Sequence, residues 1–476
     1  MRPISFDAFH PEPGTLVEWA VTPATAAAAL AAPTDPVPPS YNQQLHLQAD
    51  RVAARAGLPG NPWIGASFEL DGRLDLAALE RAFTIWVRRH GALRSGFREG
   101  PAGVERFTVP AELVTLEQQP ARPFDCPAAL RAHLADRFAT GTDPFAWPFL
   151  VLGVIDRPSR STVFLALDHV AGDGFSLALA VWELQTSYEA AVRGVEPSLP
   201  ETGSFLDSCL AELARGQAIG SDDPAVAHWR GFIRDCGGTA PTFPLDLGVA
   251  PGQAWPQHVY DTLLLEPAAA ADFEAACREL GGGIFAGLFA ALGLTVRELT
   301  GQQDFRTITP LHTRHEESWL TAMGWFITCA PVAFSLAGAD GFAEVLPRAQ
   351  AAVRTALGMS KYPAVRMIEL LGDDFQVTRR DLFSMVSYTD YRRLPGAERH
   401  RQSQPVTIGQ VTEADDSHVW ISRQHDGLHI AIRHPDTPVA RDVLDRYTAG
   451  IRAVLAGVTA GHGPALATAG AAASGG

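Results

Sequence analysis

The chain has 476 residues, of which 46% are hydrophobic and 19% are charged, and its formal net charge is -15. This length exceeds one ordinary hydrophobic core, so two domains are expected, and the composition is that of a globular protein. The acidic balance argues against a nucleic-acid-binding protein, because neutralising phosphates requires clustered Lys and Arg side chains.

The sequence contains no run of eighteen apolar residues, so we expect no membrane span. The apolar stretch Ala26–Ala32 is short and lacks a basic segment before it, which argues against a signal peptide. We therefore expect a cytoplasmic protein. The five cysteines are scattered and never spaced as Cys-x-x-Cys, which favours isolated thiols over a disulfide framework or a zinc site.

The first part of the chain alternates strand-like and helical patterns. Phe68–Leu70 predicts a short strand, and Asp75 is a suitable N-cap for the amphipathic helix that follows, with Gly91 expected to end it. Thr162–Leu167 is a nearly continuous apolar run, which is typical of a buried strand. The stretch Phe175–Arg193 then predicts a helix.

The second part of the chain continues the same alternation. Helices are predicted over Ala268–Leu280 and Ile284–Leu299, and strands over Trp325–Phe334, Leu382–Tyr388 and Leu428–Ile432. The proline-containing segment Val195–Gly203 is the predicted link between lobes. We therefore expect a mixed α/β protein with a first lobe over residues 1–195, a second over 204–456, and a disordered tail over 457–476.

The clearest chemical signal is the run Asp168–Gly174, which lies between the predicted buried strand and its following helix. A strand end is a rigid place from which to hold a base at the edge of a cavity. His169 suits this role because the unperturbed pKa of histidine is near neutrality. Asp173 is placed to orient the loop, and Gly174 is expected to let the backbone pass closely, with a positive φ. The motif alone also fits a histidine that only completes a strand–helix turn.

Further segments lie in the order in which a known superfamily has them. They are Leu70–Asp75, Arg89–Arg94, Thr309–Arg314 and Gly324–Thr328. Together with His-x-x-x-Asp-Gly, they resemble the condensation-domain and chloramphenicol-acetyltransferase-like acyltransferases. The amino-terminal runs Pro13–Trp19 and Pro38–Tyr41 are similar to those of the polyketide-associated acyltransferases of mycobacterial lipid synthesis, including those that acylate trehalose.

This resemblance implies two chloramphenicol-acetyltransferase-like lobes that form a V-shaped pseudo-dimer with a central tunnel. It implies an enzyme that transfers an acyl group from CoA, or from an acyl or peptidyl carrier protein, to a hydroxyl acceptor in natural-product or lipid biosynthesis. We expect a monomer that needs no metal or other cofactor. Two alternatives remain open: a stand-alone amide-forming condensation enzyme that acts on an amine, and a non-catalytic condensation-like domain that recruits a partner.

The resemblance also implies a role for each residue of the motif. His169 is implied to deprotonate the acceptor. Asp173 is implied to pair with Arg314 and, together with Gly174, to support the loop. An ion pair of this kind would hold the loop geometry, although desolvation offsets its contribution to stability.

Three more residues enter through the same resemblance. Asp168 stands where peptide-forming condensation domains usually have a second histidine, which favours ester formation over amide formation. Ser384 and Ser387 lie on a predicted strand that the family brings near the cavity. A hydroxyl group there is suited to donate a hydrogen bond to the tetrahedral oxyanion.

Overall fold

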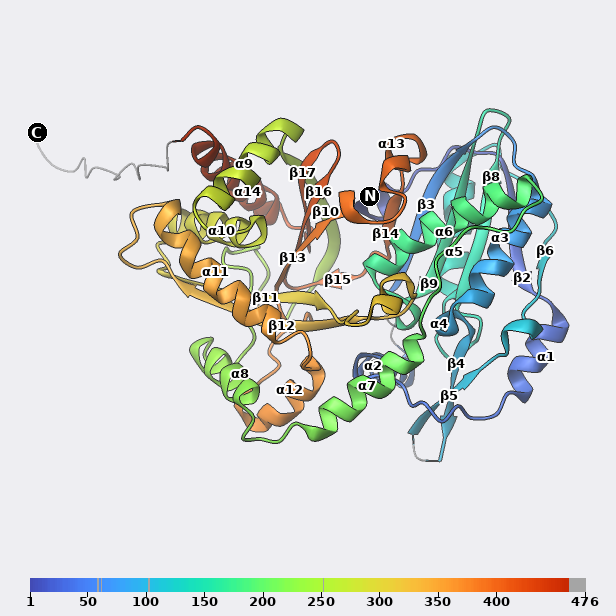
Figure 1. Ribbon diagram of the computed structural model, residues 1–476, viewed down its shortest axis with the longest axis horizontal. Helices are drawn as coiled ribbons and strands as arrows, with labels where there is room; N and C mark the ends of the chain where they lie inside the picture. Colours follow the sequence, from blue (N-terminus) through green and yellow to red (C-terminus); the bar gives the residue numbers. More distant parts are fainter. Residues whose placement is uncertain (58–59, 61, 102, 251, 462–476) are drawn as a thin grey trace, which may run out of the picture.

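The computed structural model describes residues 1–57, 60, 62–101, 103–250 and 252–461. Figure 1 shows two lobes side by side, each with helices packed on a β-sheet. The described part of the chain forms one sheet of eight strands, one of seven, and a separate pair of strands. The predicted mixed α/β fold with two lobes is confirmed.

The sheet of the first lobe has the order β1-β14-β3-β9-β8-β2-β6, and β7 pairs with β2. Its strands are β1 (Arg2–Ser5), β2 (Thr15–Val21), β3 (Trp63–Asp71), β6 (Leu116–Gln118), β7 (Arg122–Pro123), β8 (Leu150–Asp156), β9 (Arg160–Asp168) and β14 (Val406–Gly409). Strand β9 is buried from Ser161 to Asp168. It lies between β3 and β8, at the centre of the sheet.

Successive side chains of β9 point to opposite faces of the sheet and are apolar on both, so helices cover both faces. Val163 and Leu165 lie in the apolar cluster formed with α3 (Leu76–Arg89) and α6 (Gly174–Val192). Phe164 lies instead in the cluster formed with α5 (Pro127–Gly141). The predicted strand over 162–167 is therefore a two-faced core strand, and it ends at the His-x-x-x-Asp-Gly motif.

The sheet of the second lobe has the order β12-β11-β13-β16-β17-β10-β15. Its strands are β10 (Trp255–Leu265), β11 (Asp304–His312), β12 (Ile327–Ser335), β13 (Met385–Asp390), β15 (Glu413–Ala414), β16 (His418–Gln424) and β17 (Gly427–Pro435). The large core of this lobe includes buried residues of α9 (Pro267–Glu279), α10 (Ile284–Thr300), α11 (Phe342–Gly358) and α14 (Pro438–Thr459). All four helices are visible on the side of this sheet away from the first lobe (Figure 1).

One strand crosses the expected boundary between the lobes. Val406–Gly409 lies within the range 204–456 assigned to the second lobe, but it forms β14 in the sheet of the first. There it runs parallel to β1 and antiparallel to β3. Strand β14 hydrogen-bonds to the edges of β1 and β3 that face it, and these edges would otherwise be unpaired. The range 204–456 is therefore not one lobe in space.

The remaining elements are shorter or lie around the sheets. They are α1 (Pro23–Ala31), α2 (Tyr41–Arg55), α4 (Gly91–Arg94), α7 (Phe205–Ala218), α8 (Pro224–Asp235), α12 (Ala364–Leu371), α13 (His400–Ser403), β4 (Ser95–Gly100), β5 (Gly103–Thr108) and the 3-10 helices η1 (Phe6–Ala8), η2 (Ala111–Leu113), η3 (His169–Ala171), η4 (Glu317–Thr321), η5 (Gly372–Asp374), η6 (Tyr391–Arg393) and η7 (Ala397–Arg399). Helix α3 confirms Asp75 as its N-cap, since the carboxylate accepts a hydrogen bond from the N–H of Ala78.

The predicted end of α3 is wrong. The helix stops at Arg89, His90 is extended, and Gly91 begins α4 instead of closing α3. His90 is fixed by tertiary contacts, because its Nε2 lies 2.6 Å from the buried carboxylate of Glu183 and its Nδ1 accepts from the N–H of Met323. Such contacts override the local preference of glycine for a helix end.

The predicted tail also begins too early. Helix α14 continues to Thr459 because Val454, Leu455 and Val458 are buried on one face of its last turns. Residues 462–476, the rest of the predicted tail, lie outside the described residues. In the described part of the chain, no single helix is long and apolar enough to cross a membrane; α9 and α10 reach that length only as a pair bent by 96°.

Candidate active site

The His-x-x-x-Asp-Gly motif forms a short turn between β9 and α6. His169–Ala171 is one turn of 3-10 helix, capped by the Asp168 carboxylate, which accepts a hydrogen bond from the N–H of Val170 at 2.7 Å. Asp173 is the N-cap of α6 and accepts from the N–H of Ser176 at 2.7 Å. The two aspartates therefore cap the two helical segments that meet here, which fixes the backbone on both sides of His169.

Asp173 forms a buried ion pair with Arg314, which follows strand β11 of the second lobe. Nη1 donates to Oδ2 at 2.9 Å and Nη2 donates to Oδ1 at 3.1 Å, a two-pronged contact. The side chain of Arg314 is 0% exposed and that of Asp173 is 2% exposed. The guanidinium also lies between the rings of Phe175 and Phe326, at 4.5 and 4.3 Å from their centroids. The pairing implied by the resemblance is present, and it joins the two lobes at the motif.

The charge of Asp173 is stabilised by this environment. Burial alone raises the pKa of its carboxyl group, but the charge and hydrogen bonds of Arg314, together with hydrogen bonds from Ser176, hold the pKa below its usual range. The carboxylate also accepts from the N–H of Phe326 at 3.0 Å, at the start of the segment that leads into β12. Asp173 is therefore committed to the structure of the loop and does not serve as a proton acceptor.

His169 lies against Trp325 of the second lobe. The ring centroids are 4.1 Å apart, with 40° between the planes. The residue is partly exposed, and its Nδ1 is buried. Burial lowers the pKa of His169, and nearby His46 lowers it further, whereas a hydrogen bond to its own backbone and the charges of Asp168 and Asp173 oppose this shift. A lowered pKa keeps the ring neutral near pH 7, the form that can accept a proton.

Asp168 is buried and points to a different partner. Its Oδ1 lies 2.8 Å from Nε2 of His46, on helix α2, and accepts the backbone N–H of Val170 as well. A carboxylate only accepts hydrogen bonds, so His46 carries a proton on Nε2 in this contact. The structure thus places Asp168 behind the turn that carries His169, in a contact with an imidazole 122 residues away in sequence.

The two candidate serines differ in their surroundings. Ser384 is 5% exposed, and its hydroxyl donates to the carbonyl of Ser417 at 2.9 Å, so that hydroxyl is already committed. Ser387 is partly exposed on β13, between Val386 and Tyr388, which pack into the core of the second lobe. Strand alternation therefore turns Ser387 to the opposite face of that sheet. Of the two, Ser387 has the hydroxyl without a hydrogen-bond partner among the described residues, as an oxyanion contact requires.

Gly174 does not have the expected backbone. It is the first residue of α6, has no positive φ, and is exposed, with nothing within 4 Å of where a Cβ would lie. The tight glycine of the site is Gly324, with φ of +156°, where an added Cβ would lie only 2.4 Å from the ring of Phe205. The hydroxyl of Ser176 bonds both the N–H and the carbonyl of Gly324. The close backbone approach predicted at Gly174 is therefore found at Gly324, in the other lobe.

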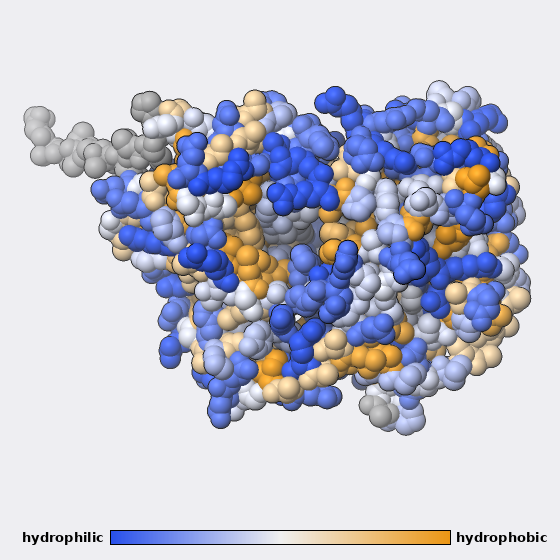
Figure 2. All heavy atoms as spheres, viewed as in Figure 1, coloured by the Kyte–Doolittle hydropathy of each residue, from blue (hydrophilic) through white to orange (hydrophobic). Residues whose placement is uncertain are grey.

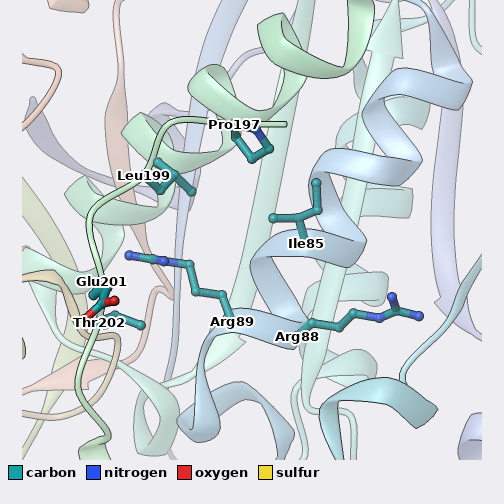
Figure 3. Close-up of a pocket in the computed structure, with 7 residues that line it drawn as sticks. All are labelled: Ile85, Arg88, Arg89, Pro197, Leu199, Glu201 and Thr202. Atoms are coloured by element: carbon teal, nitrogen blue, oxygen red, sulfur yellow. The ribbon is translucent and has the colours of Figure 1, made fainter. Parts of the chain in front are cut away.

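The surface is hollowed between the two lobes, where the tunnel implied by the resemblance would open (Figure 2). Two further cavities lie elsewhere, and neither is lined by His169. One of about 590 Å³ lies between α3 and the 195–203 segment (Figure 3). Among its lining residues, Arg89 is committed to the buried carboxylate of Glu183 and to the carbonyl of Pro200. The other, of about 460 Å³, lies between α2 and α7 and includes Tyr41 and Leu210.

Three residues that contact the motif or its partners were not predicted from the sequence. His46 and Gln43, on α2, reach the turn from about 120 residues away, and Trp325 contacts the imidazole from the second lobe. The available signals were weak. Ser40 and Gln43 have the spacing of a helix capping box, and Trp325 lies in one of the segments that carried the family resemblance.

The model of the condensation-domain family matches residues 63–419. This span is well over half of the chain and contains the Asp168–Gly174 turn and Arg314. The chain belongs to the condensation-domain family.

Similar proteins narrow the assignment within this family. The chain is 30% identical over 453 residues to the 2'-acyl-2-O-sulfo-trehalose (hydroxy)phthioceranyltransferase PapA1 of Mycobacterium bovis, covering 94% of this chain and 86% of that protein. It is 28% identical to the trehalose-2-sulfate acyltransferase PapA2 of the same species, covering 93% and 94%. The solved structure of a PapA2 acyl transferase has a TM-score of 0.88 and 25% identity, covering 96% of this chain and 100% of that one. The protein is therefore an acyltransferase of this family.

Proposed function

We propose that this acyltransferase forms an ester by transferring an acyl group from a thioester to a hydroxyl group, with His169 as the general base. The observation that carries the proposal is the placement of this imidazole. It lies at the junction of the lobes, on a turn fixed by the buried Asp173–Arg314 pair, and its lowered pKa favours the neutral ring. Because Nδ1 is buried, Nε2 is the nitrogen that we propose faces the acceptor.

The proposed reaction follows from this geometry. Nε2 of His169 accepts the proton of the acceptor hydroxyl while the oxygen of that hydroxyl attacks the thioester carbon. This attack forms a tetrahedral oxyanion. The carbon–sulfur bond then breaks, the ester is released, and the imidazolium returns its proton to the departing thiolate. Atoms and charges balance with a base alone, so the proposal requires no metal or redox group. A base of this kind contributes about 10²–10⁴-fold, and binding of both substrates in place supplies the rest.

The relatives support a sugar or other alcohol as acceptor. The names of the two mycobacterial proteins describe acylation of trehalose sulfates. We therefore propose a carbohydrate hydroxyl as acceptor, and a CoA or carrier-protein thioester as donor, in the synthesis of an acylated lipid or natural product. Ser387, on β13, is the proposed contact for the oxyanion.

His169→Ala is the direct test of the base. Transfer from a medium-chain acyl-CoA to a sugar acceptor, followed by intact-mass analysis, is expected to fall at least about 10²-fold with an unchanged circular dichroism spectrum. His425→Ala is the matched control, because His425 is exposed in the turn between β16 and β17. Retention of more than about one per cent of wild-type transfer by the folded His169→Ala variant would remove His169 from the role of base.

The choice of acceptor has a separate test. A matched alcohol and amine on one scaffold are offered to the wild-type enzyme, and kcat/KM is compared. We expect the alcohol to be preferred. An amine preferred by about tenfold, which corresponds to about 1.4 kcal/mol in the transition state, would replace the ester-forming assignment by the amide-forming one. Transfer to neither acceptor, from CoA and carrier-bound donors alike, would instead favour a recruitment domain.

A further inference from the structure

Helix α2 lies against the turn that carries His169, and its buried face is polar at this point. Its N-terminus is capped by Ser40 and Gln43, which exchange hydrogen bonds with each other's backbone. Gln43 is 2% exposed and His46 is 9% exposed. Since buried polar side chains require partners, the contacts of these two residues show what the helix face is built to hold.

Both residues hold the backbone of the same residue, Val170. The Nε2 group of Gln43 donates to the carbonyl of Val170 at 2.8 Å. His46 contacts Oδ1 of Asp168, and that same oxygen accepts the N–H of Val170. The carbonyl and the N–H of the residue directly after His169 are therefore both held by groups that α2 supplies or supports.

The imidazole itself is held from the other lobe. Trp325 lies 4.1 Å from the ring of His169 and 5.4 Å from the ring of His46, edge-on to the latter. The charged or titratable groups around His169 are His46 from α2, Asp168 from β9, and Asp173 from the start of α6, the last neutralised by Arg314. Helix α2 and Trp325 thus enclose the turn from two sides.

We propose that Gln43 and His46 are positioning residues: they hold the backbone of Val170, the residue after His169, so that the imidazole of His169 stays against Trp325 and faces the acceptor. This inference rests on the proposed role of His169 as base. It assigns Asp168 to the same support, as the link between His46 and the N–H of Val170. Misplacement of a base by about 1 Å can cost as much as about 10²-fold in rate, so this support matters for the chemical step.

Arg106 makes a conservative test possible at Gln43. This arginine is 1% exposed, donates to Oε1 of Gln43 at 2.6 Å, and has Nε and Nη1 buried without partners among the described residues. A glutamate at position 43 keeps the acceptor for Arg106 and adds a charge opposite to that of the guanidinium. It replaces the N–H donor to Val170 by a carboxylate oxygen, which cannot donate to that carbonyl and repels it. Gln43→Glu is therefore expected to fold while releasing the turn.

The first experiment compares Gln43→Glu with Gln48→Glu in the full-length enzyme. Gln48 is exposed on the same helix and provides the matched control. Gln43→Glu is expected to lower kcat about tenfold or more, to leave the KM for acyl-CoA within about twofold, and to keep the melting temperature of the wild type. Gln48→Glu is expected to match the wild type in all three.

The second experiment separates hydrogen bonding from side-chain bulk at His46. His46→Gln keeps an N–H donor for Asp168, whereas His46→Leu does not. We expect the glutamine variant to retain kcat within about threefold and the leucine variant to lose about tenfold or more, with KM little changed in both. Exposed His425→Leu is the control.

Clear outcomes would overturn the inference. They are a folded Gln43→Glu enzyme with wild-type kcat, or His46→Gln and His46→Leu variants that are equally impaired, which would indicate packing alone. If His46→Leu does not fold, the Gln43→Glu comparison decides. His169→Ala is assayed beside them: an active His169→Ala enzyme removes the proposed base, whereas an inactive one with fully active Gln43→Glu removes only the positioning role.

Discussion

The buried pair between Asp173 and Arg314 gives the most quantitative prediction. Asp173 accepts four hydrogen bonds, two from the guanidinium and one each from the N–H groups of Ser176 and Phe326. Arg314 also donates to the hydroxyl of Ser176 at 3.0 Å. Removing one member of such a pair leaves the other charge buried, which costs about 3–5 kcal/mol. Replacing both members avoids that cost.

Asp173→Asn and Arg314→Ala are therefore each expected to lower the melting temperature by about 10 °C, taking roughly 2–4 °C per kcal/mol for a domain of this size. The melting temperature of the double variant is expected to lie well above the value calculated by adding the decreases of the two single variants. All three variants are expected to impair transfer, because the pair fixes the turn that carries His169, and the losses in kcat/KM are not expected to multiply.

The assay is a double-variant cycle, with melting followed by circular dichroism and transfer followed by mass analysis. Arg306→Ala is a suitable control, since its ion pair with Asp304 is on the surface, where such pairs contribute only about 0–1 kcal/mol. Effects of the two site variants that add to within about 0.5 kcal/mol would refute the reasoning, because independent sites behave in that way.

Other predictions follow from the same geometry. Because the pKa of His169 is lowered, kcat/KM should fall on the acid side with a midpoint below about 6.5; a midpoint above 6.5 would contradict this. The pKa of Asp173 is also lowered, so its contribution to stability should be present above about pH 3.9 and be lost as pH falls through the folded-state value, measured as the melting temperature against pH. Gly324→Ala should cost about 1–3 kcal/mol through backbone strain and contact with Phe205, whereas Gly174→Ala should change stability by less than about 0.5 kcal/mol; equal shifts in melting temperature would contradict this.

Local sequence patterns predicted the elements that depend on neighbouring residues in the chain. The apolar run at 162–167 lies within β9, and Asp75 caps α3 as its side chain allows. The four-residue strand β14 was not predicted, because its position depends on pairing with β1 and β3, more than 300 residues away. The end of α3 was misplaced for a related reason, since His90 is held by Glu183 and Met323 and not by its neighbours in sequence.

The residues of the site also divide into those that the sequence predicts and those that depend on tertiary packing. The sequence identified His169 as the candidate base from its place after a buried strand, and the family resemblance supplied the partner Arg314. No local pattern indicates that His46 and Gln43 reach this turn, because polar residues in an amphipathic helix are usually exposed. Their burial becomes visible only when α2 is packed against the end of β9.

The position of Asp168 in the structure changes the inference about the acceptor that was drawn from its presence in the sequence. In sequence, an aspartate in place of the second histidine of peptide-forming relatives favours an alcohol. In the structure, its carboxylate bonds Nε2 of His46 and the N–H of Val170. Asp168 therefore holds the turn through its hydrogen bonds, and it acts on His169 only through its charge, which raises the pKa of that ring.

Asp168→His tests this conclusion, because it restores the histidine of the peptide-forming relatives. The new imidazole would be buried against His46 and would lose the carboxylate that accepts from both His46 and Val170. We expect a lower melting temperature and lower kcat for alcohol and amine acceptors alike, with the ratio of their kcat/KM values unchanged within about threefold. A shift of about tenfold or more toward the amine, about 1.4 kcal/mol, would show instead that this position selects the acceptor through the chemical step. Asp168→Ala serves as the control, since it removes the same hydrogen bonds without adding a histidine.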